Sequence, residues 1–141
     1  MDREAAMRIR SGQTILFQGD IITDADRNRW EPHNLGTGCV IMVAQRFSKE
    51  HPEVNVTFLN RGISGNRIRD LRERWQEDCL DLKPDIVSIM IGVNDTLGTF
   101  LWGEPTSIED FGKGLRRHSG SEPEKSGCAD SLDGAIHSPL V

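Results

Sequence analysis

Three short polar clusters have the residue types for chemistry, and each directly follows an apolar run of the chain. They are Gly19-Asp20-Ile21, the stretch Asn60 to Gly65, and Gly92-Val93-Asn94-Asp95. Taken singly, each is an ordinary turn or helix cap, because glycine, asparagine and aspartate favour those positions. Their shared placement at the ends of apolar runs suggests one common site.

The elements that must position these clusters follow from the hydrophobic pattern. Apolar runs predict buried strands over 14–17, 54–59 and 85–91. Apolar residues spaced by three and four predict helices over 39–50 and 67–82, and a capping-box-like start at Ser107 to Asp110 predicts a third helix over 107–117. In the first of these helices, the residues expected to face the core are Cys39, Met42, Val43 and Phe47. Strands that alternate with helices predict a parallel α/β sheet, whose sites lie at the carboxyl ends of its strands.

Together, and in this order, the clusters resemble the motifs of the SGNH (GDSL-type) ester hydrolases. That family carries Gly-Asp-Ser after its first strand, a glycine after the second and Gly-x-Asn-Asp after the third. The resemblance covers about residues 12–117. It implies a three-layer, flavodoxin-like parallel sheet, incomplete here at its C-terminal side. It also implies hydrolysis of acyl or acetyl esters, often on carbohydrates.

The resemblance assigns a role to each matching position. Residue 21 takes the place of the nucleophile. Its backbone N–H, the N–H of Gly65 and the side-chain amide of Asn94 would form the oxyanion hole, which stabilises a tetrahedral intermediate. Asp20 and Asp95 are expected to hold their loops in shape.

Ile21 is the first departure from the family pattern. Isoleucine has no nucleophilic atom, so it can keep the backbone donor but cannot form an acyl-enzyme. In a comparable triad enzyme, loss of the serine lowers kcat about a millionfold. Thr23 should point elsewhere, and no base is positioned for Ser64. We therefore predict impaired catalysis. Two alternative explanations of Ile21 are a buried aliphatic side chain that fills the site and a single base change in the gene.

The missing base is the second departure. The family's histidine lies in an Asp-x-x-His motif after two further strands. The late candidate is His137, but its spacing from Asp133 is one residue too long. We interpret His137 as a tail residue, and His51 and His118 as surface or loop residues. His33 is likewise interpreted as a surface or loop residue, with an approach to the site from the loop after the first motif as the alternative.

The sequence pattern changes near residue 117. Residues 1–117 are predicted to form the N-terminal part of an SGNH hydrolase domain, and residues 118–141 an irregular tail. Codon degeneracy permits the tail to encode an apolar strand in a shifted frame. We hypothesise a frameshift near Arg117, which the coding DNA would test.

Composition restricts the partners of this 141-residue chain. A net charge of −5 argues against nucleic acid or anionic membrane as the main partner. No apolar run approaches the roughly 18 residues of a membrane span, and the acidic first residues, with no apolar stretch after them, do not match a signal-peptide pattern, so none is expected. The three cysteines match no zinc or disulfide pattern, which favours a cytoplasmic location with Cys39 and Cys79 in the core. No motif indicates a metal or another cofactor.

Three functions stay open on this sequence: an ester hydrolase by ancestry, a non-catalytic protein that binds an ester or carbohydrate, and a non-functional gene fragment. The expected ligand is a small-molecule ester, such as an acetylated carbohydrate. Self-association through an uncovered edge of the sheet is also expected. Trp30, Phe100 and Trp102 are expected in loops near the site, where they would stack on a sugar ring or pack the loops onto the domain.

Overall fold

Three parallel strands form the centre of the fold: β1 (Thr14–Gly19), β2 (Thr57–Asn60) and β3 (Ile86–Met90). The computed structural model describes residues 9–116. In it the strands pair in the order β2-β1-β3, with parallel neighbours throughout. This is the start of the strand order of flavodoxin-like folds. The predicted flavodoxin-like α/β fold is confirmed.

The register brings the carboxyl ends of the strands together. Phe17 lies beside Asn60, and Gly19 lies beside Met90. The three sequence clusters therefore leave the sheet at the same end, as the parallel arrangement predicts.

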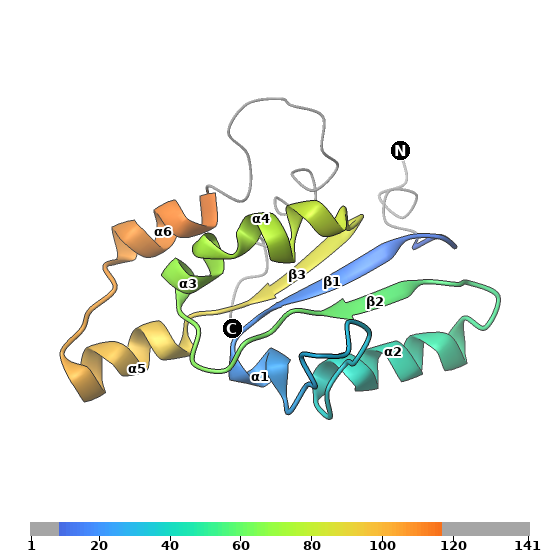
Figure 1. Ribbon diagram of the computed structural model, residues 1–141, viewed down its shortest axis with the longest axis horizontal. Helices are drawn as coiled ribbons and strands as arrows, with labels where there is room; N and C mark the ends of the chain where they lie inside the picture. The colour runs from blue at the N-terminus through green and yellow to red at the C-terminus, as the bar shows by residue number, and fades with distance from the viewer. Residues whose placement is uncertain (1–8, 117–141) are drawn as a thin grey trace, which may run out of the picture.

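Helices cover both faces of this sheet (Figure 1). Helices α1 (Ile21–Asp24) and α2 (Cys39–Glu50) lie on one face. On the other lie α3 (Ile68–Glu73), α4 (Trp75–Asp78) and α6 (Ile108–Arg116). A short 3-10 helix, η2 (Leu80–Leu82), follows α4. Helix α5 (Val93–Trp102) lies beyond the carboxyl end of β3.

The main core lies between the sheet and the layer formed by α3 and α4. Its buried members are Leu16, Leu59, Ile68, Leu71, Trp75, Cys79 and Val87. Each fully buried side chain of this size contributes roughly 1.5–3 kcal/mol through the hydrophobic effect. Cys79 is fully buried, as predicted for a small core residue.

The continuous helix predicted over 67–82 is wrong, although its apolar spacing is correct. Ile68, Leu71, Trp75 and Cys79 are all buried. The backbone nevertheless leaves helical geometry at Arg74 (φ −98°, ψ 5°) and again at Cys79. Apolar spacing fixes which side chains face the sheet, but it does not require an unbroken backbone.

Helix α2 has its predicted bounds but a different buried face. Val40 and Ala44 are buried, and the Phe47 ring packs 5.8 Å from the Phe58 ring. Cys39 is exposed, contrary to its predicted place in the core, and Met42 is 66% exposed. Residues 40, 44 and 47 form an alternative stripe, rotated from the predicted one, and this stripe meets the sheet.

Helix α5 was not expected, and it corrects the predicted positions of two aromatic residues. Phe100 and Trp102 lie on α5 and not in a loop. The Gly92-Val93-Asn94-Asp95 motif is thus the first turn of a helix, which fixes the orientation of its amide and carboxylate side chains.

Strand β3 forms one edge of the described sheet, and Ser88 and Met90 on it are exposed. Self-association through this edge stays a prediction. The predicted boundary at 117 and the tail 118–141, with His118 and His137, lie outside the described residues. The frameshift stays a hypothesis that only the coding DNA tests.

Candidate active site

The turn after β1 is shaped by Asp20, which is 1% exposed. Its Oδ1 accepts a hydrogen bond from the Ile22 N–H at 3.1 Å and so caps the first turn of α1. Ile21 opens that turn, and its side chain is 54% exposed. The alternative of a buried aliphatic residue filling the site is wrong: position 21 faces solvent at the carboxyl end of the sheet.

Gly19 allows this turn to lie against β3. A Cβ atom at position 19 would collide with the Met90 carbonyl oxygen and lie 2.5 Å from Thr23 Oγ1. The Gly19 carbonyl also accepts a hydrogen bond from the Ile63 N–H at 3.0 Å. The first motif is therefore tied directly to the loop that carries the second.

Asn60, the last residue of β2, organises the neighbouring loops. It is fully buried, and its Nδ2 donates to the carbonyls of Thr23 at 2.6 Å and Leu35 at 2.9 Å. Its Oδ1 accepts from the Gly62 N–H at 2.9 Å. The sequence analysis placed Asn60 at the start of the second cluster but assigned it no role, although an asparagine that ends an apolar strand was a usable signal.

The second motif continues into an exposed turn. Asp24 Oδ2 accepts a hydrogen bond from the Ser64 N–H at 2.8 Å. Gly65 has φ +85°, a conformation that favours glycine, while a Cβ there would meet nothing within 4 Å. Its backbone geometry therefore explains the glycine better than crowding by neighbours. Among residues 9–116, no acceptor takes the N–H of Gly65 or of Ile21, so both remain available to a ligand.

The third motif is fixed to the start of α3. Asn94 Nδ2 donates to the Asn66 carbonyl at 3.0 Å, which leaves the amide a second N–H. Asp95 is 6% exposed. Its carboxylate accepts from the Ile68 N–H at 3.0 Å and from Thr106 Oγ1 at 2.8 Å. Asp95 thereby ties the first turn of α5 to the start of α3 and to the loop before α6.

Arg74 joins the loops to one another and was missed by sequence reasoning. Its Nε donates to Asn66 Oδ1 at 2.7 Å, its Nη2 to the Gly19 carbonyl at 3.1 Å and its Nη1 to the Arg61 carbonyl at 2.7 Å. Asp78 Oδ2 lies 3.0 Å from Nη1 and balances the charge. The Arg74 side chain is 13% exposed. It enters the site from the break between α3 and α4, where an apolar pattern gives no signal.

Charge further stabilises the turn that carries Ser64. Burial raises the pKa of Asp24, but hydrogen bonds from Arg29 and the Ser64 N–H, with the charges of Arg29 and Arg27, outweigh burial and lower it. For Arg74, burial lowers the pKa, and the hydrogen bond and charge of Asp78 oppose this. An arginine stays protonated under such conditions, so both networks are ionic at neutral pH.

The described residues place no histidine in this network. His33 lies in the loop before α2, where it lines an open hollow of about 520 Å³, together with Ile41. Ile21, Gly65 and Asn94 do not line that hollow. His51 is exposed at the end of α2, as predicted. Within residues 9–116, no set of three or more His, Cys, Asp or Glu side chains is grouped as a metal site would require.

Of the hydroxyl groups near position 21, Thr23 is 3% exposed, and its Oγ1 packs toward Gly19. Ser64 is exposed.

No helix in the described part of the chain is both long and apolar enough to cross a membrane.

Comparison with known proteins agrees with this geometry. The GDSL-like lipase/acylhydrolase family matches residues 17–120. The chain belongs to this family. It is 50% identical over 93 residues to an acetylxylan esterase of Geobacillus stearothermophilus, a match covering 63% of this chain and 42% of that protein.

Solved structures show the same similarity in three dimensions. The crystal structure of an acetylxylan esterase from Geobacillus stearothermophilus matches with a TM-score of 0.73 and 41% identity, covering 79% of this chain and 54% of that one. A putative GDSL-like lipase from Parabacteroides merdae matches with a TM-score of 0.73 and 39% identity, covering 78% and 53%. The chain thus spans about half the length of these relatives. Structures of the acetylxylan esterase include catalytic mutants in which a serine or a histidine is replaced by alanine.

The role of Arg74 predicts a large loss of stability in Arg74→Met. Methionine removes the charge and the donors, so Asp78 loses its nearest cation and the carbonyls of Gly19 and Arg61 each lose a hydrogen bond. We expect the free energy of unfolding to fall by about 3–5 kcal/mol, measured by urea denaturation. The control is Arg72→Met, since Arg72 is exposed near the end of α3, two residues before Arg74, and its substitution should cost less than about 0.5 kcal/mol. Equal effects of the two substitutions would contradict this role.

The lowered pKa of Asp24 predicts a pH-dependent effect of Asp24→Asn. Because the folded state favours the carboxylate, its contribution is complete above the pKa of the unfolded chain, about 3.9, and is lost as pH falls toward the lower folded value. At pH 7 the variant should be about 2 kcal/mol less stable than the wild type. That difference should shrink below about pH 4.

Denaturation curves between pH 7 and 3 check this, with Asp26→Asn as the control because Asp26 is exposed two residues further on. A difference that stays constant over the whole range would show that the Asp24 charge is unimportant.

Proposed function

We propose that this chain keeps the acyl-binding site of the GDSL-like acylhydrolases but does not turn over esters. The observation that carries this proposal is an isoleucine, 54% exposed, at the position of the family nucleophile. The turns around it are hydrogen-bonded to one another and to Arg74. The site is thus well formed, while the atom that would attack the substrate is missing.

The proposed binding mode uses groups that do not depend on the side chain at position 21. The carbonyl oxygen of an ester would accept hydrogen bonds from the N–H groups of Ile21 and Gly65 and from the Asn94 amide. Each such donor is worth about 3 kcal/mol when charge develops on that oxygen. Without a nucleophile the carbonyl stays planar, so these donors bind the ester without promoting an acyl transfer.

The proposed ligand is an acetyl ester on a carbohydrate. Support comes from the 50% identity to an acetylxylan esterase over 93 residues and from the family match over residues 17–120, which include all three motifs. In that relative a serine and a histidine are catalytic, whereas the described residues of this chain place isoleucine at the nucleophile position and no histidine beside it. A cytoplasmic location stays a prediction from the cysteine pattern.

Hydrolysis of p-nitrophenyl acetate tests the loss of turnover. We expect the unmodified chain to release nitrophenol no faster than its Ile21→Ala variant, because position 21 contributes no reacting atom in either protein. Ile21→Ser restores the hydroxyl, and intact-protein mass spectrometry should then detect an acetyl adduct that the unmodified chain lacks.

Saturable turnover by the unmodified chain that disappears in Ser64→Ala would overturn this account, because it would make Ser64 the nucleophile. Thermal denaturation of the same samples separates two further readings. A cooperative transition supports a folded binding protein, whereas no transition would favour the non-functional fragment.

A further inference from the structure

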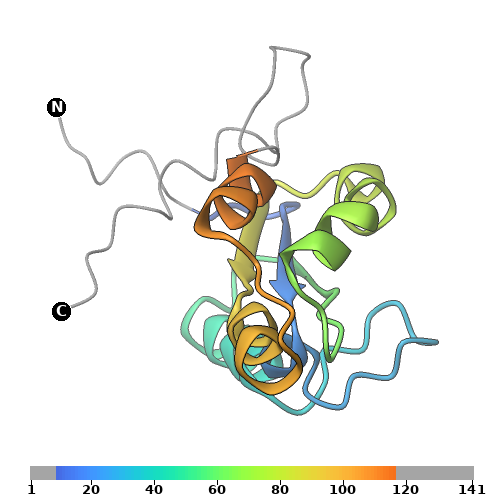
Figure 2. The ribbon, with the colours of Figure 1, turned by 90° about the vertical axis from the view of Figure 1, so that its left-hand side faces the viewer.

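The loop between α1 and α2 presents Trp30 to solvent. Its side chain is 94% exposed, which contradicts the alternative that it packs the loop onto the domain. The loop projects sideways from the end of the sheet where the strands terminate (Figure 2). A tryptophan buries a large apolar area when it finds a partner, so full exposure at this position leaves a broad flat ring for a ligand.

The loop around Trp30 is held in one conformation by its own polar side chains. Asn28 Oδ1 accepts from the Trp30 N–H at 3.2 Å, and Asn28 Nδ2 donates to Glu31 Oε1 at 2.9 Å. Asn34 Nδ2 donates to Glu31 Oε2 at 3.3 Å, while Asn34 Oδ1 accepts from the N–H groups of Asn28 and Gly36. A preorganised loop loses little conformational entropy when a ligand binds.

The same loop is fastened to the second motif of the site. Arg27 Nη2 donates to the Gly62 carbonyl at 2.8 Å, and Arg61 Nη1 donates to the Pro32 carbonyl at 3.0 Å. Arg27 is 9% exposed, so this anchor is buried. The position of Trp30 is therefore fixed relative to the turn that carries Gly65.

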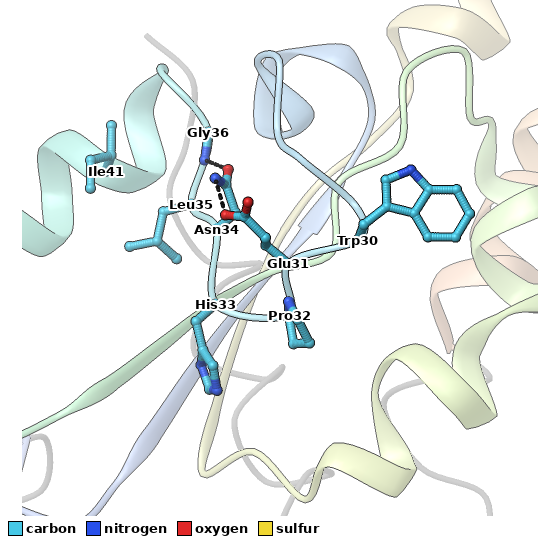
Figure 3. A pocket seen from close by; sticks show the side chains of 8 residues that line it. All are labelled: Trp30, Glu31, Pro32, His33, Asn34, Leu35, Gly36 and Ile41. Carbon is cyan, nitrogen blue, oxygen red and sulfur yellow. Dashed lines mark hydrogen bonds between the residues drawn. The ribbon is translucent and has the colours of Figure 1, made fainter.

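The loop that carries the Trp30 ring also carries polar side chains. Trp30, Glu31 and Asn34 line the open hollow of about 520 Å³ that this loop forms, and Figure 3 shows the indole extending away from Leu35 and Ile41. The Glu31 carboxylate accepts one hydrogen bond on each oxygen from the two asparagines, which leaves lone pairs for ligand hydroxyls. A flat apolar ring on the same loop as free acceptors matches a sugar, which has an apolar C–H face and hydroxyls at its edge.

We infer that Trp30 is a stacking platform for a sugar ring of the carbohydrate whose acetylated residue occupies the acyl site. This inference rests on the proposed function for the acetyl group, but the stacking itself needs only the sugar. It assigns the loop between α1 and α2 to the binding of a xylo-oligosaccharide chain next to the site.

Titration of the protein with xylohexaose and with acetylated xylohexaose tests this stacking platform. Binding is measured by tryptophan fluorescence and by calorimetry. Trp30→Ala should weaken binding of both sugars about tenfold and abolish most of the fluorescence change. Trp30→Phe, which keeps an aromatic face, should recover most of the affinity. The matched control is Phe100→Ala, because Phe100 is 80% exposed on α5 and should leave both affinities unchanged.

The outcomes separate the platform from the acyl site. Unchanged affinity in Trp30→Ala, or an equal loss in Phe100→Ala, overturns the platform. A Trp30-dependent affinity that is the same for both sugars supports the platform and overturns the acetyl preference of the proposed function. No binding of either sugar by the folded chain overturns both.

Discussion

The guanidinium of Arg74 is the interaction on which the site depends. A buried charge is tolerated only where it is paired and hydrogen-bonded, and Arg74 meets this condition by joining groups from three segments of the chain. The Gly19 carbonyl belongs to the first motif, the Arg61 carbonyl follows β2, and Asn66 in turn holds Asn94 through its carbonyl. Because the one planar guanidinium bonds to all of these groups, displacement of any one turn would also break hydrogen bonds that hold the other turns.

This arrangement explains how the site keeps its shape with isoleucine at position 21. The contacts that fix the three turns involve backbone groups and the side chains of Asp20, Asn60, Asp95 and Arg74, none of which needs a serine. The Ile21 side chain is half exposed, so the substitution requires no repacking of the core. The shape of the site is therefore independent of the nucleophile: the proposed oxyanion donors belong to the backbone and to Asn94, whereas the family nucleophile belongs to one side chain.

Strand positions, the parallel sheet and the three motif positions could all be predicted from the sequence, because apolar runs and strand-end motifs are local signals. Longer-range features could not. Arg74 and Asn60 act through partners up to 56 residues away, and no local pattern marks such contacts. The face of α2 was misassigned because two stripes, one through Cys39 and one through Val40, satisfy the same helical spacing. Helix α5 was missed because its first turn is the third motif, which was interpreted only as a strand-end cluster.

The central claim is that the site binds an acetylated carbohydrate and leaves its ester intact. One NMR titration of the isotope-labelled chain with acetylated xylohexaose tests both the binding and the lack of hydrolysis in the same sample. The account predicts saturable shifts of the backbone amide signals of Ile21 and Gly65 and of the Asn94 side-chain amide, with no growth of the free acetate signal. Release of acetate at a rate that depends on the protein concentration would contradict the account, as would a folded spectrum in which those three signals do not move.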